Sequence, residues 1–124
     1  MVESGLTTLP ESWDAKPGTG NSLNHFMLGH LVEWHFAYVA GIRQEPGSVG
    51  WKRIVIQPDP GPLQSYEATF KSPRGEIVSK GKVVDGKLRV TVAIPSGTES
   101  ATLIWPGGLR VDLPRGKTTE LVRP

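Results

Sequence analysis

The chain has 124 residues, a formal net charge of +2 and no cysteine. This length fits one domain, or one small domain with an appendage. The absence of cysteine excludes disulfide bridges, thiolate zinc sites, iron–sulfur clusters and a cysteine nucleophile. The 14 basic residues are dispersed and balanced by 12 acidic ones, so nucleic acid is not an expected partner. Gly and Pro, at 15 and 11 residues, disfavour an all-helical bundle and are typical of short strands joined by turns.

The N-terminus, Met1 to Gly5, has no basic segment followed by an apolar run, so we expect no signal peptide. An apolar segment follows at residues 23–42 and has the pattern of one helix, with Asn21 and Ser22 as N-cap candidates and Gly41 as a stop signal. Its apolar residues occupy nearly the whole circumference: Leu23, Phe26, Met27, Leu28, Leu31, Val32, Trp34, Phe36, Tyr38, Val39 and Ile42. The pattern predicts a long apolar helix, about residues 22–42, that is buried on all sides.

A membrane span is the alternative interpretation of this segment. Asn24, Glu33 and three histidines interrupt it, so we expect no membrane partner. With neither a signal peptide nor a transmembrane segment expected, the localisation is cytoplasmic or undetermined.

The pattern changes to period two after Arg43. Residues 44–50 have the composition of a linker. Strands are predicted at residues 52–57, 65–71, 76–84, 87–94, 101–105, 109–113 and 118–122. Asp85-Gly86 is a strong hairpin signal, with a positive φ expected at Gly86, and Pro106-Gly107-Gly108 marks a second hairpin. The fold class predicted is mainly β, an antiparallel, jelly-roll-like β-sandwich at residues 45–124, preceded by a helical segment at residues 1–44.

Two clusters carry candidate chemistry. His25, His30 and His35 are five residues apart, which rotates each by about 140° around a helix, so they do not share a metal-binding face. We expect no metal and no cofactor, and His30 and His35 are interpreted as hydrogen-bonded residues of a buried helix surface. Glu11 and Asp14 flank Trp13, a pattern that fits either a loop end or a sugar site, because sugars pack on tryptophan faces and are held by carboxylates.

Several ordered segments of the chain resemble bacterial α-L-rhamnosidases, glycoside hydrolase family 78. The resemblance covers residues 5 to 105, and its segments are Thr7 to Asp14, Asn21 to Phe26, Gly29 with Glu33-Trp34, Ala40 to Ile42, Gly50 to Pro58, Tyr66 to Ala68, Ser72 to Ser79 and Asp85 to Leu88. The resemblance implies that the helix is a remnant of an (α/α)6 barrel. It also implies that the sandwich is the family's C-terminal domain.

The family cleaves terminal L-rhamnose with inversion, which requires two carboxyl groups on opposite sides of the sugar. The resemblance implies that Glu11 is the general base and that His25 contacts the sugar, with Trp13 as a further substrate-binding candidate. The general acid lies in a region absent from this chain. Two positions depart from the family pattern: Pro10 stands where a tryptophan is usual, and Gly81 where an aromatic residue is frequent, which predicts a weaker core.

Three functions remain open. The first is a C-terminal piece of a rhamnosidase-like protein that is inactive alone and acts as an accessory or self-associating module. The second is a glycosidase for terminal L-rhamnose, active alone or with another chain. The third is a carbohydrate-binding sandwich, which needs an exposed aromatic platform, with Trp51, Tyr66 and Trp105 as candidates.

The expected partner is a second copy of the chain, contacted through the helix from Leu23 to Ile42, because a sandwich covers at most one side of that helix. The rival arrangement is a helix folded back fully onto its own sandwich, with residues 1–20 as a lid.

Overall fold

The computed structural model describes residues 30–124, together with Pro10, Ser12, Lys16, Gly18, Gly20, Ser22 and Asn24. Its helical part is short: α1 (His30–Trp34) continues directly into a π-helical turn, η2 (His35–Val39). The strands that follow are β1 (Ile42–Gln44), β2 (Arg53–Ile56), β3 (Ser65–Ser72), β4 (Gly75–Val84), β5 (Lys87–Ile94), β6 (Ser100–Ile104), β7 (Arg110–Asp112) and β8 (Lys117–Val122). The mainly β class predicted from the sequence is confirmed.

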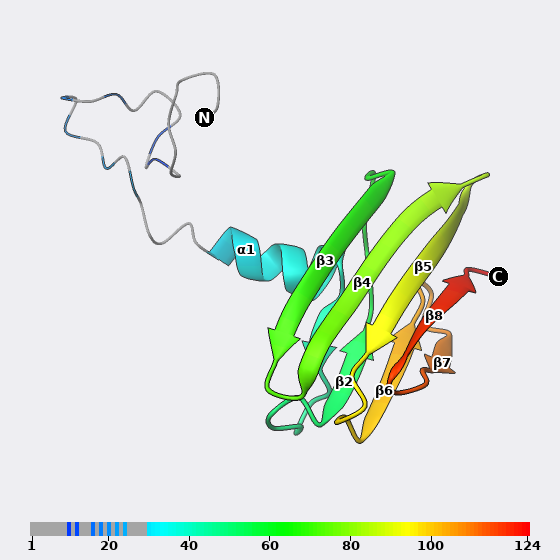
Figure 1. Ribbon diagram of the computed structural model, residues 1–124. Helices are drawn as coiled ribbons and strands as arrows, with labels where there is room; N and C mark the ends of the chain where they lie inside the picture. Colours follow the sequence, from blue (N-terminus) through cyan, green and yellow to red (C-terminus); the bar gives the residue numbers. More distant parts are fainter. Residues whose placement is uncertain are drawn as a thin grey trace. The chain divides into compact units, whose positions relative to one another are not determined.

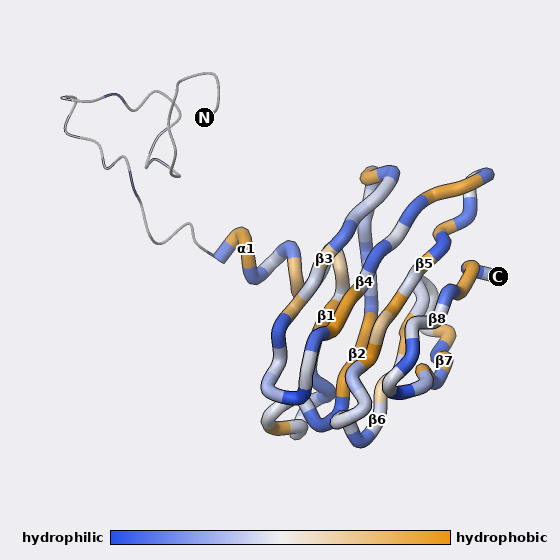
Figure 2. Tube along the Cα trace, viewed as in Figure 1, coloured by the Kyte–Doolittle hydropathy of each residue, from blue (hydrophilic) through white to orange (hydrophobic). Residues whose placement is uncertain are grey.

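The strands form two four-stranded sheets, with the orders β1-β2-β6-β7 and β3-β4-β5-β8. The second sheet is antiparallel throughout and faces the viewer in Figure 1, with β2 and β6 behind it. Exposed and covered residues alternate along β3 and β5, as expected for sheets with one face on the core. Apolar and polar colours alternate along these strands accordingly (Figure 2).

One strand pair departs from the antiparallel arrangement that the sequence predicted. β2 and β6 run parallel, with Ile54 opposite Ala101 and Ile56 opposite Leu103. Parallel neighbours need a long crossover, and here the connection between them contains the whole β3-β4-β5 meander of the other sheet. Period-two alternation predicts that a segment is a strand, but it does not indicate which strand it pairs with or in which direction. The sequence therefore did not predict this parallel pair.

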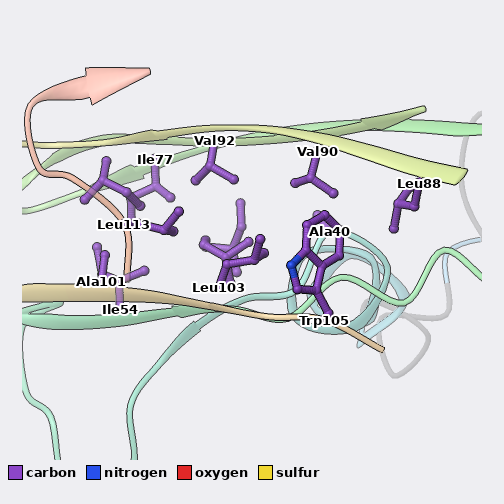
Figure 3. Close-up of a cluster of buried hydrophobic side chains, with 13 residues drawn as sticks. Ala40, Ile54, Ile77, Leu88, Val90, Val92, Ala101, Leu103, Trp105 and Leu113 are labelled. Atoms are coloured by element: carbon purple, nitrogen blue, oxygen red, sulfur yellow. The ribbon is translucent and has the colours of Figure 1, made fainter. Parts of the chain in front are cut away.

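The core fills the space between the two sheets and contains aliphatic side chains from both (Figure 3). Ile77, Leu88, Val90 and Val92 extend from the β3-β4-β5-β8 sheet toward side chains of the other sheet, including Leu103. The remaining buried members are Ala40, Ile42, Ile54, Ile56, Ile94, Ala101, Trp105 and Leu113. Fully burying one large aliphatic side chain contributes about 1.5–3 kcal/mol, so this cluster is the main source of stability.

The long apolar helix expected at about residues 22–42 is wrong at its C-terminal end and in its described N-terminal positions. Ser22 and Asn24 are not helical, and the helix ends at Val39. Val39, Ala40 and Ile42 are buried with the sandwich, so their apolar character serves the β core rather than a continuous helix. Residues 23 and 25–29 lie outside the described part of the chain.

Gly41 terminates the helix, as its sequence position suggested, with a φ of 69°. Its carbonyl accepts a hydrogen bond from the Gln57 amide at 2.8 Å, and a Cβ at Gly41 would overlap the Gln57 backbone. The close approach lets the chain pass directly from η2 into β1, whose Ile42 lies opposite Ile56 of β2. The sequence had assigned Gln44 to a linker, but it is the last residue of this strand.

Both predicted hairpins are confirmed. Asp85 and Gly86 connect β4 to β5 with φ values of 51° and 73°, the double positive φ of a type I′ turn. Pro106-Gly107-Gly108 connects β6 to β7, closed by a hydrogen bond from the Trp105 amide to the Leu109 carbonyl at 2.9 Å.

Candidate functional site

The site residues named from the sequence, Glu11, Trp13 and His25, lie outside the described residues. Their roles as general base and sugar contacts stay predictions. His30 and His35 are described, and both are exposed rather than part of a buried helix surface, which corrects that interpretation. In the part of the chain that the structure describes, no three histidine or carboxylate side chains cluster as metal ligands. No described helix has the length and hydropathy needed to cross a membrane.

The three aromatic residues proposed as a sugar platform belong to the core instead. Trp105 is 2% exposed and packs between the sheets (Figure 3). Trp51 is half-buried, with its ring centre 4.5 Å from that of Phe70, which in turn lies edge-on to Phe36. None of the three therefore offers the open face that stacking on a sugar requires.

Tyr66 is the third of these aromatics, and its ring occupies the place that Gly81 leaves empty. The two residues are directly opposite in β3 and β4, and a Cβ at Gly81 would overlap the ring. The weaker core expected at Gly81 is therefore compensated by a cross-strand aromatic side chain. Burial raises the pKa of the Tyr66 hydroxyl to about 12, and the nearby Ser79 hydroxyl opposes this with a smaller lowering.

Ser79 connects the end of the helix to the β3-β4-β5-β8 sheet. Its hydroxyl is fully buried and donates a hydrogen bond to the Ala40 carbonyl at 2.8 Å, while the Tyr66 hydroxyl lies 3.4 Å from Ser79 Oγ. This contact satisfies a helix-terminal carbonyl that has no intrahelical partner. It also fixes the position of η2, and so of Tyr38, on the sandwich.

Among the described tryptophan, tyrosine and phenylalanine side chains, the exposed ones are Trp34 and Tyr38, which are 51% and 52% exposed. They line a surface hollow of about 280 Å³ with Arg43, Gln57, Pro58, Asp59 and Pro106, and we call it the aromatic hollow. The guanidinium carbon of Arg43 lies 4.9 Å from the centre of the Tyr38 ring, within cation–π distance. The hollow therefore combines two aromatic rings with a cation, an amide and a carboxylate.

Backbone contacts hold the aromatic hollow in place. The Asp59 amide donates to the Tyr38 carbonyl at 3.0 Å, and Arg43 Nε donates to the Ala37 carbonyl at 2.7 Å. Arg43 and Gln57 are held next to each other by the β1–β2 pairing and by the adjoining bond from the Gln57 amide to Gly41. Residues distant in sequence are thus fixed around one site by regular structure.

Several hydrogen-bond donors and acceptors around the aromatic hollow have no partner among the described residues. Arg43 uses only Nε, which leaves the terminal guanidinium nitrogens without an acceptor among the described residues. Asp59 Oδ1 accepts a weak bond from the Gly61 amide at 3.3 Å, and Oδ2 has no donor in the described part of the chain. The Gln57 side-chain amide likewise makes no hydrogen bond within it.

A second hollow of about 420 Å³ adjoins the first and shares Arg43 and Gln57 with it. Its other lining residues are Gln44, Glu45, Pro46, Val55, Ile104 and Arg110. Glu45 is paired with Arg53 at 3.1 Å, and the Gln44 side-chain oxygen accepts from the Trp51 amide at 2.7 Å. The two hollows adjoin at Arg43 and Gln57, and we call them together the groove.

A third hollow, of about 530 Å³, lies over the outer face of the β3-β4-β5-β8 sheet. Its charges are largely paired across strands. Lys80 Nζ lies 2.7 Å from Glu67 Oε1, and Arg89 Nη1 lies 3.7 Å from Glu120 Oε1. This surface has the character of a solvated sheet face with cross-strand ion pairs.

Comparison with known proteins shows which families and relatives the chain matches. Residues 41–122 match the model of the bacterial alpha-L-rhamnosidase C-terminal domain, and residues 1–39 match that of the bacterial alpha-L-rhamnosidase 6 hairpin glycosidase domain. An alpha-L-rhamnosidase of Streptomyces avermitilis is 34% identical over 112 residues, covering 84% of this chain and 10% of the relative. One from Formosa agariphila is 30% identical over 122 residues, covering 95% of this chain and 13% of the relative.

The chain also aligns with solved structures of alpha-L-rhamnosidases. The alpha-L-rhamnosidase from Dictyoglumus thermophilum aligns with a TM-score of 0.71 at 30% identity, over 83% of this chain and 12% of that protein. The Streptomyces avermitilis enzyme complexed with L-rhamnose aligns with a TM-score of 0.68 at 34% identity, over 82% of this chain and 10% of that protein. The fold of residues 41–122 is therefore that of the C-terminal β-sandwich domain of these proteins.

The chain belongs to the bacterial α-L-rhamnosidase family and corresponds to its C-terminal region. It spans only about a tenth of the length of the curated relatives that it matches.

The sequence did not predict the groove, although it contained part of the signal. Trp34 and Tyr38 are spaced i, i+4 within the apolar segment that the sequence predicts as one helix. The polar residues that surround them, Gln57 and Asp59, were assigned to a strand end and a turn. Their approach to Tyr38 depends on the β1–β2 pairing, in a stretch where β1 was not predicted.

Proposed function

We propose that this chain is a non-catalytic accessory module of the α-L-rhamnosidase type and does not hydrolyse rhamnosides by itself. The observation that supports this is coverage: the chain matches 10% and 13% of its first two relatives. Inverting hydrolysis needs an acid and a base about 6.5–9.5 Å apart around the sugar. The resemblance supplies only Glu11 as a base, and the general acid of the family lies in a region that this chain lacks.

The test is hydrolysis of an aryl α-L-rhamnoside by the purified chain, with Glu11→Gln as the matched variant. We expect the release of the aryl alcohol to equal the buffer background for both proteins, since acid–base assistance alone is typically worth about 10²–10⁴-fold. Turnover by the unmodified chain that disappears in Glu11→Gln would show that the chain is an enzyme.

A second candidate function is self-association through the helix. Leu31, Val32, Trp34 and Tyr38 are each about half exposed or more, and Leu31, Trp34 and Tyr38 have the i, i+3, i+7 spacing of one helix face. A two-fold axis pairs identical patches, so a second copy is the simplest cover for this stripe. The described stripe is shorter than the one expected from the sequence, which favours a weak, concentration-dependent dimer.

A further inference from the structure

We propose that the groove formed by the aromatic hollow and its neighbour is a binding site for a neutral oligosaccharide. The inference rests on the proposed non-catalytic function, to which it adds a ligand. A carbohydrate-binding sandwich needs an exposed aromatic platform, for which the sequence offers Trp51, Tyr66 and Trp105 as candidates. The structure places that platform at Trp34 and Tyr38 instead.

The first argument is the combination of groups. Sugar rings present apolar C–H faces that pack on aromatic rings, and hydroxyl groups that both donate and accept hydrogen bonds. Trp34 and Tyr38 supply half-exposed rings. Arg43 supplies donors, Asp59 an acceptor, and Gln57 both, all with unused capacity in the described part of the chain.

The second argument is charge. Arg43 and Asp59 line the same hollow, so the local charge is balanced. In the adjoining hollow, the lining residues Arg110 and Glu45 carry opposite charges, and Glu45 also lies 3.1 Å from Arg53. An anionic ligand would be attracted by Arg43 but repelled by Asp59, whereas a neutral polyol bonds to both. The balance therefore favours uncharged sugars.

The third argument is size and rigidity. The hollows of about 280 and 420 Å³ share Arg43 and Gln57, so together they fall in the range of roughly 300–1,000 Å³ typical of small-molecule sites. That extent suits two or three linked sugars. The lining residues are held by strand pairing and backbone hydrogen bonds, which lowers the entropy lost on binding.

The fourth argument separates the saccharide from an apolar protein partner. A surface made only to receive another helix gains nothing from free guanidinium, amide and carboxylate groups beside its aromatic rings. Covering those groups without partners would cost free energy. The hydroxyl groups of a saccharide would satisfy them.

The experiment is isothermal titration calorimetry of the full chain with L-rhamnose, cellobiose and maltotriose as probes. We expect at least one oligosaccharide to bind more tightly than L-rhamnose, with a dissociation constant on the order of 1 mM. Trp34→Ala and Tyr38→Ala should each weaken binding by about tenfold or more. Asp59→Asn, a nearly isosteric change, should weaken it by about fivefold through loss of an acceptor.

Leu63→Ala is the matched control, because Leu63 is 46% exposed and lines neither hollow. Its affinity should equal that of the unmodified chain. Absence of heat with every probe at about 10 mM, or binding that Trp34→Ala and Asp59→Asn leave unchanged, would overturn the assignment. A stable dimer that binds no probe would assign the aromatic hollow to a second copy and overturn it as well.

The outcome is separable from that of the proposed function. Hydrolysis of an aryl rhamnoside would contradict the non-catalytic role whatever the calorimetry shows. Absence of both hydrolysis and binding would contradict the saccharide site alone.

Discussion

Tyr66 shows how a single residue can offset a missing side chain. Its ring lies over Gly81, and its hydroxyl lies near the fully buried Ser79. An aromatic ring placed across from a glycine fills the volume that a larger residue would otherwise occupy. The result is a tyrosine whose ionised form is disfavoured, because burial removes the phenolate from water.

This environment predicts a dependence of stability on alkaline pH. The pKa of Tyr66 is raised from 10.0 to about 12 in the folded chain, so the unfolded chain loses the proton first as the pH rises. The stabilising contribution is complete below pH 10 and is lost between pH 10 and about 12. At about 1.4 kcal/mol per pKa unit, the loss amounts to about 2–3 kcal/mol.

The measurement is the urea midpoint between pH 9 and 11.5 for the unmodified chain and for Tyr66→Phe. We expect the midpoint of the unmodified chain to fall more steeply, since the two proteins differ only in the Tyr66 hydroxyl. Parallel curves would show that the phenol is not desolvated in the folded state.

At the scale of one element, the junction between η2 and β1 depends on a single glycine, Gly41. The chain changes from helix to strand within two residues, because Gly41 adopts a positive φ and touches the Gln57 backbone. This contact brings Tyr38 to Asp59 and Arg43 to Gln57, and so creates the aromatic hollow. The glycine has both a conformational and a steric role.

A pair of glycine variants separates these two roles. Gly86 has a similar φ of 73°, but a Cβ there would meet no neighbour within 4 Å. We expect Gly86→Ala to cost about 1 kcal/mol, from the positive φ alone. Gly41→Ala should cost at least about 2 kcal/mol more, because the new methyl group displaces β2. Equal shifts of the urea midpoint for the two variants would contradict the close approach.

The elements show where sequence reasoning succeeds and where it stops. The strand with the cleanest alternation and the strongest turn signal, β5 after Asp85-Gly86, was predicted with its observed bounds, and its neighbours β3 and β4 to within one residue. β1 was missed because its three residues join an apolar run to a Pro-Gly turn, and its strand conformation depends on pairing with β2. The helix was predicted too long because Val39 and Ile42 are apolar. Both are buried with the sandwich, and helical periodicity does not distinguish such residues from those of an apolar helix.

The candidate site was less predictable than the fold for the same reason. Glu11, Trp13 and His25 came from the resemblance to a family, and they lie outside the described residues. The groove combines Trp34 and Tyr38 with side chains from β1 and the end of β2, which approach one another only through strand pairing and the Gly41 contact. A local pattern shows that such residues are aromatic or polar, but it does not show that they face one hollow.

At the scale of the whole molecule, the free energy gained by burying the helix stripe in a dimer is close to the free energy that association costs. Burying a large apolar side chain fully contributes about 1.5–3 kcal/mol, and the three residues of the stripe, Leu31, Trp34 and Tyr38, are already partly covered. Association of two chains costs roughly 4–15 kcal/mol in lost freedom. We therefore expect a dimer that dissociates on dilution.

The dimer and the saccharide compete, because both would cover Trp34 and Tyr38. A ligand that binds only the monomer shifts the equilibrium toward it by mass action. Light scattering of a concentration series should show a mass rising from 13.5 kDa toward twice that value, and added oligosaccharide should lower it. A monomeric mass at every concentration would contradict association through the helix.

Two variants separate the uses of this surface. Leu31 belongs to the helix stripe by its spacing but does not line the groove. Leu31→Glu should abolish the dimer, because it places a charge on the contact, and should leave saccharide binding intact. Trp34→Glu should abolish both, since Trp34 belongs to the stripe and to the hollow. If Leu31→Glu remained dimeric while Trp34→Glu became monomeric, the dimer contact would be centred on the aromatic hollow rather than on the helix stripe, which would contradict the proposed contact.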